Sequence, residues 1–157
     1  MVQDKPGVLN RVSSTFRRRG FNLASLAVGR SETEGFSRMT FVVEGTNEEV
    51  DQVIKQLDKL IDVIKVSDIS REDVVSRELA LIKITTSTST RPEVLQLAET
   101  FRSHVVDVST DSVIIEVTGD GHKITSLIRI LEPYGISEVM RTGQIGLIRG
   151  ISEFQRP

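Results

Sequence analysis

The chain has 157 residues, a length typical of one domain or two small ones. Its 20 basic and 22 acidic residues give a net charge of −2, and residues 1–72 contain 11 of each. This balance argues against a nucleic-acid module that neutralises phosphates. The lack of cysteine excludes disulfides, thiolate metal sites and cysteine nucleophiles. No apolar run approaches the roughly 18 residues of a membrane span, so we expect a cytoplasmic protein without membrane contact.

The first elements follow a tight entry loop over residues 4–7. A helix is expected after it, and Gly20 is expected to end that helix in left-handed backbone. The apolar side chains that fall on one helical face are Val8, Leu9, Val12 and Phe16. Alternating apolar residues then predict strands over 21–29 and 38–43, separated by a polar turn at 32–35.

A second helix is predicted to begin at Thr46, because Thr46 and Glu49 have the spacing of a capping box. Its apolar stripe is expected to consist of Val50, Val53, Ile54, Leu57 and Ile61. Residues 63–69 are predicted to form a short closing strand. Only three residues precede the entry loop, so any first strand is expected to be a stub. The predicted order for residues 1–69 is (β)αββαβ.

The same order repeats after a polar stretch at 70–77, which is interpreted as a linker. A strand is predicted at 79–85, and a helix with a second capping box at Thr90 and Glu93 follows it. The expected apolar stripe of that helix is Val94, Leu97, Ala98 and Phe101. A hairpin of 105–108 and 113–117 leads to a last helix and a closing strand at 136–141. The stripe of that last helix is expected to consist of Ile124, Leu127, Ile128 and Leu131.

The repeated order predicts an α+β protein of two consecutive ferredoxin-like βαββαβ sandwiches, with helices on one face of each antiparallel sheet. The predicted domains are residues 1–72, with a truncated first strand, and residues 78–157. A sheet that helices cover on one side leaves its other side to solvent or to a partner. We therefore expect the chain to form oligomers.

The entry loop is the strongest candidate for a binding site. Gly7 removes a side chain where a ligand can meet the backbone, and the amides of Gly7, Val8 and Leu9 lie at a helix N-terminus that favours an anion. Asp4 can accept hydrogen bonds from an ammonium group, and Asn22 can orient the ligand. Together these groups suit the zwitterionic head of an amino acid. The alternative is an ordinary strand-to-helix turn in which Asp4 caps the amides.

Other polar residues give weaker indications. The basic run 17–19 is either a docking patch for an acidic partner or a solvated helix end. His104 and His122 are interpreted as structural or exposed residues, because no nucleophile or metal ligand has the spacing to accompany them. We therefore expect neither catalytic residues nor a metal site.

Seven segments, in order along the whole chain, resemble the small subunit of acetohydroxyacid synthase, also called acetolactate synthase. These segments are residues 6–12 (PGVLNRV), 18–23, 25–29, 37–40, 56–63, 77–83 and 141–143. The N-terminal half is similar to an ACT domain, a small-molecule-binding module with the βαββαβ order. Members of this family often have Asn at the position of Asp4, and they have a complete strand before the entry loop.

The resemblance implies a regulatory subunit that is not itself catalytic and holds no cofactor. Its partner would be a catalytic large subunit that carries thiamine diphosphate, a divalent metal and FAD. The chain would activate that partner and confer feedback inhibition by valine, leucine or isoleucine. Two chains would pair through their ACT domains and bind the effector between them. The implied effector-binding residues are Asp4, Gly7, Val8 and Leu9 of one chain with Asn22 and Leu23 of the other.

Two alternatives remain at this point. The chain could be a stand-alone amino-acid-binding ACT module that regulates another partner, instead of a subunit of acetohydroxyacid synthase. Association with a thiamine-dependent large subunit would distinguish these two functions. The location could also be a plastid, if a transit peptide is removed.

Overall fold

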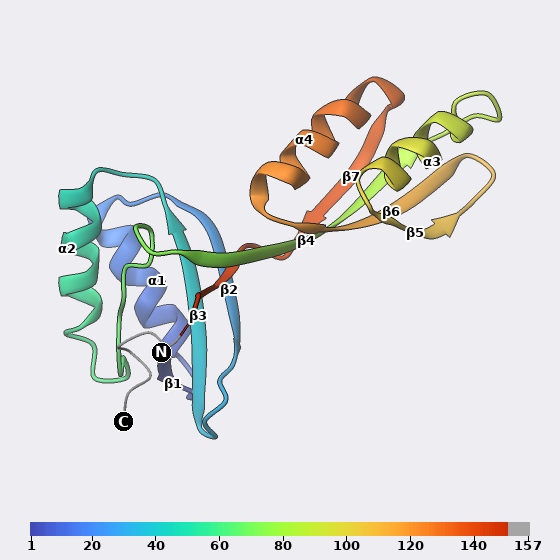
Figure 1. Cartoon of the computed structure of the whole chain (residues 1–157). Coiled ribbons are helices and arrows are strands. Elements are labelled where there is room, and N and C mark those ends of the chain that lie inside the picture. The colour runs from blue at the N-terminus through green and yellow to red at the C-terminus, as the bar shows by residue number, and fades with distance from the viewer. Residues whose placement is uncertain (151–157) are drawn as a thin grey trace. The chain divides into compact units, whose positions relative to one another are not determined.

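The computed structural model describes residues 1–150, with the backbone alone for Arg19, as two compact units (Figure 1). The first unit contains Met1–Val75 together with the segment that begins at Gly146. The second unit contains Ser76–Ile145. Residues 146–150 therefore group with the first unit, whereas the sequence prediction placed them in the second domain.

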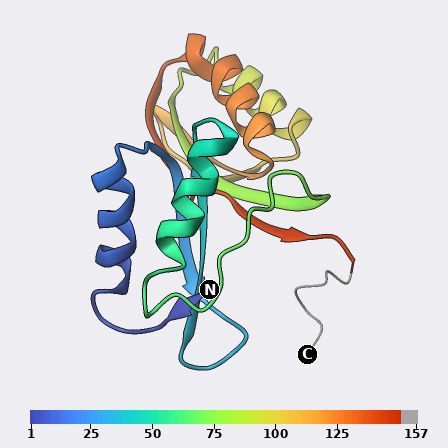
Figure 2. The ribbon, with the colours of Figure 1, turned by 90° about the vertical axis from the view of Figure 1, so that its left-hand side faces the viewer.

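The first unit is a small antiparallel sheet with two helices on one face. Its elements are β1 (Val2–Gln3), α1 (Val8–Arg19), β2 (Leu23–Arg30), β3 (Phe36–Val43) and α2 (Asn47–Leu57). The strand order is β1-β3-β2, so β2 lies at an edge. Figures 1 and 2 show α1 and α2 side by side against the same face of the sheet.

The core of this unit lies between that sheet face and the two helices. Val12 and Phe16 of α1 are buried, and the Phe16 ring packs against Phe41 of β3 with 5.0 Å between centroids. Leu9 was predicted on the same face of the helix, but its side chain is 45% exposed. The apolar stripe of α1 is thus narrower than the sequence suggested.

The predicted closing strand at 63–69 does not form. Val63 makes an isolated bridge with Val2. Beside it, the Ile64 amide donates to the Met1 carbonyl at 2.9 Å, and the Gln3 amide donates to the Asp62 carbonyl at 2.8 Å. A two-residue β1 offers too few backbone groups to pair with a longer strand. The stub predicted for the first strand is confirmed by β1, and its partner after α2 is correspondingly short.

The α2 helix begins as the sequence predicted and ends earlier. The Glu49 amide donates to the Thr46 hydroxyl, and the Thr46 amide donates to the Glu49 carboxylate at 2.7 Å, which completes the capping box. The helix ends at Leu57, so Ile61 is not part of its stripe. The Ile61 side chain is 90% exposed.

The second unit repeats the architecture with complete strands. Its elements are β4 (Val74–Thr85), α3 (Arg91–Thr100), β5 (His104–Val108), β6 (Ser112–Gly119), α4 (Gly121–Leu131), a 3-10 turn (Glu132–Tyr134) and β7 (Ile136–Arg141). The strand order β5-β6-β4-β7, with every neighbour antiparallel, is that of a ferredoxin-like sandwich. The predicted fold class is therefore confirmed.

The core of the second unit is apolar throughout. Alternate residues of β4 and β6 meet the stripes of α3 and α4 in one buried cluster. Its buried members are Ala80, Ile82, Ile84, Val94, Ala98, Val113, Ile115, Val117, Ile124, Leu127 and Leu131.

A bidentate ion pair joins Arg141 of β7 to the buried carboxylate of Glu78 on β4, and it raises the pKa of Arg141.

Two local predictions for the second half are wrong, and one strand was not predicted. The second capping box is absent, because the Thr90 hydroxyl accepts from the Ser87 amide and not from α3, while Glu93 accepts from the hydroxyl of Tyr134. The expected linker at 70–77 contains the start of β4 at Val74. An unpredicted strand, β8 (Ile145–Ile148), pairs with β4.

Candidate functional site

The entry loop has the backbone geometry that a ligand-binding turn requires. Gly7 adopts a left-handed conformation, with φ 84° and ψ −7°, at the N-cap of α1. An L side chain is strained there, which explains the choice of glycine. The Asp4 amide donates to the Gly35 carbonyl at 2.8 Å and ties the loop to the turn between β2 and β3. The loop is thus held at one end of the sheet.

No side chain caps the N-terminus of α1, and its first turn has no acidic residue. The Val8 amide donates to the Lys5 carbonyl at 3.3 Å. Among the described residues, the amides of Gly7 and Leu9 have no acceptor. Free amides at a helix start, added to the helix dipole, attract a carboxylate or another anion. The alternative in which Asp4 caps these amides is not what the structure contains.

The predicted side chains of the loop differ in exposure. Val8 is buried in the core, so it can meet a ligand only through its backbone. Asp4 and Gly7 are exposed, and Leu9 is half exposed. The loop therefore presents the Asp4 carboxylate, the Lys5 ammonium group and the Leu9 side chain to solvent beside its free amides.

Asn22 and Leu23 lie at the opposite end of α1 from the entry loop. The helix has 12 residues, which separates its ends by about 18 Å. Asn22 is exposed and precedes the edge strand β2, while Leu23 is half-buried opposite Val43. A single chain therefore does not bring together the two halves of the predicted site.

Arg11 is a residue that the sequence analysis did not single out. Its guanidinium forms an ion pair with Asp62 at 2.7 Å, and a side chain at Gly7 would lie 3.7 Å from its Nη1 atom. The Asp62 side chain is 10% exposed and that of Arg11 is 50% exposed. Arg11 thus places a positive charge beside the free amides, one helical turn after the loop.

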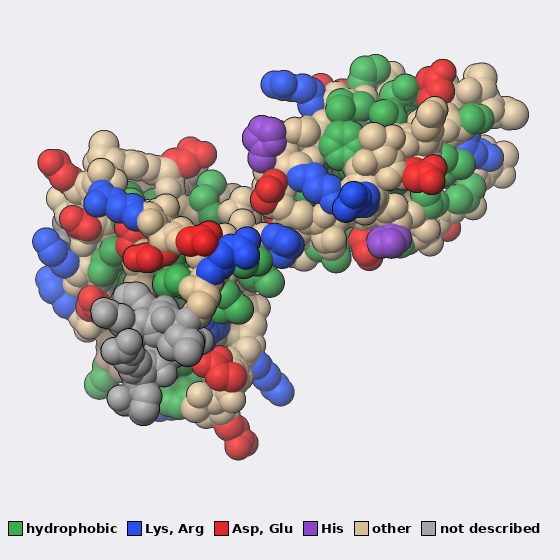
Figure 3. All heavy atoms as spheres, viewed as in Figure 1, with side chains coloured by type: hydrophobic (Ala, Val, Ile, Leu, Met, Phe, Trp, Pro, Cys, Tyr) green, Lys and Arg blue, Asp and Glu red, His purple; other side chains and the backbone are tan. Residues whose placement is uncertain are grey.

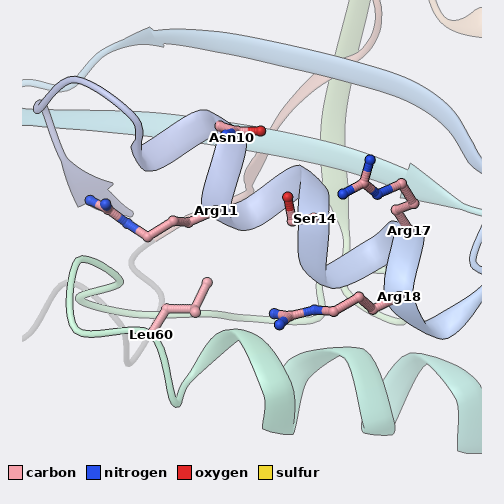
Figure 4. A pocket seen from close by; sticks show the side chains of 6 residues that line it. All are labelled: Asn10, Arg11, Ser14, Arg17, Arg18 and Leu60. Carbon is pink, nitrogen blue, oxygen red and sulfur yellow. The ribbon is translucent and has the colours of Figure 1, made fainter.

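A groove of about 400 Å³ runs along the outer side of α1 (Figure 4). It is lined by Asn10, Arg11, Ser14, Arg17, Arg18 and Leu60. In Figure 4, Leu60 points toward α1 from the turn after α2, and the Arg18 side chain extends toward it. The structure therefore places two members of the predicted basic run, Arg17 and Arg18, in one groove with Arg11.

The two histidines lie in the second unit, apart from the entry loop. His104 begins β5 and His122 lies in the first turn of α4, and both are exposed. Among residues 1–150, no group of three or more acidic or histidine side chains is placed to hold a metal ion. Nor is any described helix long and apolar enough to cross a membrane. In Figure 3, acidic and basic side chains are interspersed over the visible face of each unit.

Comparisons with known families identify the class of each half. Residues 1–65 match the family model described as an AHAS small subunit-like ACT domain. Residues 77–150 match the model described as the small subunit of acetolactate synthase. The first unit is therefore an ACT domain, and the second is the domain that accompanies it in these proteins.

Relatives of nearly full length name the family. The chain is 53% identical over 150 residues to the probable acetolactate synthase small subunit of Archaeoglobus fulgidus, covering 96% of this chain and 94% of that one. It is 50% identical over 154 residues to the acetolactate synthase small subunit of Bacillus subtilis, covering 97% and 89%. The chain belongs to the family of acetolactate synthase small subunits, which are regulatory subunits.

A solved structure agrees with this assignment. The crystal structure of the acetolactate synthase small subunit from Thermotoga maritima superposes with a TM-score of 0.87, at 40% identity and over 96% of this chain and 94% of that one. The relatives named here come from bacteria and an archaeon, which gives the plastid alternative no support.

Proposed function

We propose that the chain activates the catalytic large subunit of acetolactate synthase and makes it sensitive to a branched-chain amino acid. The large subunit would carry thiamine diphosphate, a divalent metal and FAD, and this chain would carry none of them. Membership of the small-subunit family supports this partner. It favours this reading over a stand-alone ACT module that regulates something else.

The observation that carries the effector site is the uncapped start of α1. The left-handed Gly7 turns free amides toward solvent, and Arg11 adds a positive charge beside them. A carboxylate bound there would satisfy the amides and meet the helix dipole. Asp4 would accept hydrogen bonds from the ammonium group, and the exposed Leu9 offers an apolar surface to a branched side chain.

The second half of the site would come from another chain. β2 is an eight-residue strand at the edge of the sheet in the order β1-β3-β2, and an edge strand is a template for pairing. If two copies pair antiparallel along β2, the beginning of each β2 lies beside the end of the other. The entry loop is tied to that end through Gly35. Asn22 and Leu23 of one chain would then face Asp4, Gly7 and their neighbours in the other.

An effector at such an interface would act by population shift. It would stabilise the paired arrangement that holds both halves of the site, and the large subunit would respond to that arrangement. A coupling of about 1–3 kcal/mol, typical of allosteric pairs, corresponds to a difference of about 5-fold to 150-fold in effector affinity between the two states. The site thus needs only a difference in effector affinity between two states.

Calorimetric titration of valine, leucine and isoleucine into the chain tests the site, with the variant Gly7→Asp beside the wild type. We expect saturable binding by the wild type and none by the variant, because Asp places a carboxylate and a strained side chain among the free amides. In the complex with the large subunit, the variant should activate normally but resist feedback inhibition.

Gly135→Asp is the matched control, since Gly135 also has a positive φ (91°) but lies in the second unit. It should bind the effector like the wild type, even if it is less stable. Full effector sensitivity of Gly7→Asp would show that the site is elsewhere.

A further inference from the structure

We propose that the groove along α1 is a docking surface for an acidic segment of the catalytic large subunit. The proposal rests on the proposed function, since it names the part of this chain that would meet that partner. The residues that define the groove are Asn10, Arg11, Ser14, Arg17, Arg18 and Leu60. Three observations carry the proposal: the charge of the groove, its apolar rim and its length.

The charge of the groove is unbalanced. α1 (VLNRVSSTFRRR) contains four arginines and no acidic residue, in a chain whose net charge is −2. Arg11 is paired with Asp62, but Arg17 and Arg18 have no ion-pair partner among the described residues. Complementing the helix dipole does not require these cations to share a groove. Two unpaired guanidinium groups in one groove fit carboxylates, to which arginine binds in bidentate fashion.

The apolar rim favours a protein segment over a small anion. Leu60 lines the groove, and the next residue, Ile61, is 90% exposed. The following residue, Asp62, returns to the groove through its ion pair with Arg11. Burial of these two aliphatic side chains against a partner would be favourable, because it removes apolar surface from water. A phosphate or a free dicarboxylate in the groove would leave Ile61 in solvent.

The length of the groove also suits a chain segment. Asn10 and Arg18 are eight residues apart on α1, a distance of about 12 Å along the helix axis. An extended segment of about four residues spans that distance. One or two acidic residues in such a segment would reach Arg17 and Arg18, and an apolar neighbour would cover Leu60 and Ile61.

The groove and the effector loop share one side chain. Arg11 lines the groove, and its guanidinium also lies beside Gly7 in the entry loop. A carboxylate bound at the loop and a segment bound in the groove would therefore both act on Arg11 and on its ion pair with Asp62. This arrangement puts the proposed regulatory input and the proposed contact with the enzyme within about three turns of one helix.

The test measures association of the full chain with the purified catalytic large subunit by surface plasmon resonance at low and high salt. For Arg17→Glu/Arg18→Glu we expect the Kd to rise about tenfold at low salt, mainly through slower association, and by less at high salt. Lys55→Glu/Lys59→Glu is the matched control, since it makes the same charge change in the same unit on exposed residues outside the groove. Its Kd should change by no more than about twofold.

Two further variants separate the two parts of the surface. Arg17→Gln/Arg18→Gln should weaken binding less than the charge reversal. Circular dichroism should confirm that both double variants remain folded. Ile61→Ser should speed dissociation without changing the salt dependence, because it removes apolar contact and no charge.

An unchanged Kd for the charge reversal, with the wild type binding normally, would overturn the docking proposal alone. A charge reversal that changes the sedimentation mass of the isolated chain would also overturn it, because the groove would then be a contact between copies. Loss of binding in the Lys55/Lys59 control to the same extent would also overturn it. A wild-type chain that does not bind the large subunit would instead refute the proposed function.

Discussion

At the scale of single residues, Arg11 joins features that are separate in the sequence. Its guanidinium reaches Asp62 across the unit and lies beside the left-handed Gly7. Asp62 is almost fully buried, and its Oδ2 atom accepts no well-aligned hydrogen bond from the described residues. The charge of Arg11 is therefore what compensates the burial of this carboxylate.

This compensation makes a prediction about stability. Arg11→Ala should lower the free energy of unfolding by about 1–3 kcal/mol, because it leaves a buried carboxylate unpaired. Arg38→Ala is the comparison, since Arg38 pairs with Glu32 at 2.8 Å but both side chains are largely exposed. It should cost no more than about 1 kcal/mol. Urea unfolding followed by circular dichroism measures both, and equal losses would contradict the prediction.

At the scale of elements, the same sequence signature has two outcomes. Thr-x-x-Glu forms a capping box at Thr46 and Glu49, but not at Thr90 and Glu93. In the second case the hydroxyl is already the acceptor for the Ser87 amide. The carboxylate of Glu93 accepts from Tyr134, a hydrogen bond that raises the pKa of this tyrosine. Competing partners near in space therefore decide whether a local capping motif forms.

The capping box of α2 should contribute measurably to the free energy of unfolding. Thr46→Ala should lower the free energy of unfolding by about 1 kcal/mol, because an N-cap side chain is lost and one amide of the first turn is left without its acceptor. Thr46→Ser keeps the hydroxyl and should behave almost like the wild type. Thermal unfolding of the two variants compares them, and a Ser variant as unstable as the Ala variant would rule out the cap as the cause.

At the scale of the whole molecule, the proposed effector site requires two chains. Gly7 and Asn22 lie at opposite ends of α1, so a complete site takes one of them from each copy. A two-fold pair along β2 would then contain two equivalent sites. The oligomer would be part of the regulatory mechanism rather than an addition to it.

Mixing two defective chains tests this arrangement directly. Gly7→Asp and Asn22→Ala should each abolish valine binding alone, whereas a mixed dimer has one site with both defects and one with neither. Random exchange of equal amounts should restore about a quarter of the sites. Calorimetric stoichiometry after exchange provides the measurement. Recovery of no sites in a mixture shown to contain mixed dimers would place Gly7 and Asn22 in the same chain's site or in none.

Local patterns along the chain predicted most of the architecture. Regular apolar spacing and the Thr46 cap predicted the helices, and the order of strands predicted both ferredoxin-like sandwiches. These features depend on contacts between residues close in the chain or on alternation that a buried face imposes. The turn at Gly7 was predicted for the same reason, because backbone conformation at a helix start is local, whereas the absence of a cap by Asp4 came only from the structure.

Features that depend on neighbours distant in sequence emerged from the folded structure alone. It reduced the predicted strand at 63–69 to a bridge at Val63, because β1 is too short to pair with more. It left Ile61 in solvent and brought Asp62 to Arg11, although 51 positions separate this pair. It also placed Gly7 far from Asn22. Periodicity records which residues are buried, but pairing between elements depends on how their lengths and edges match in space.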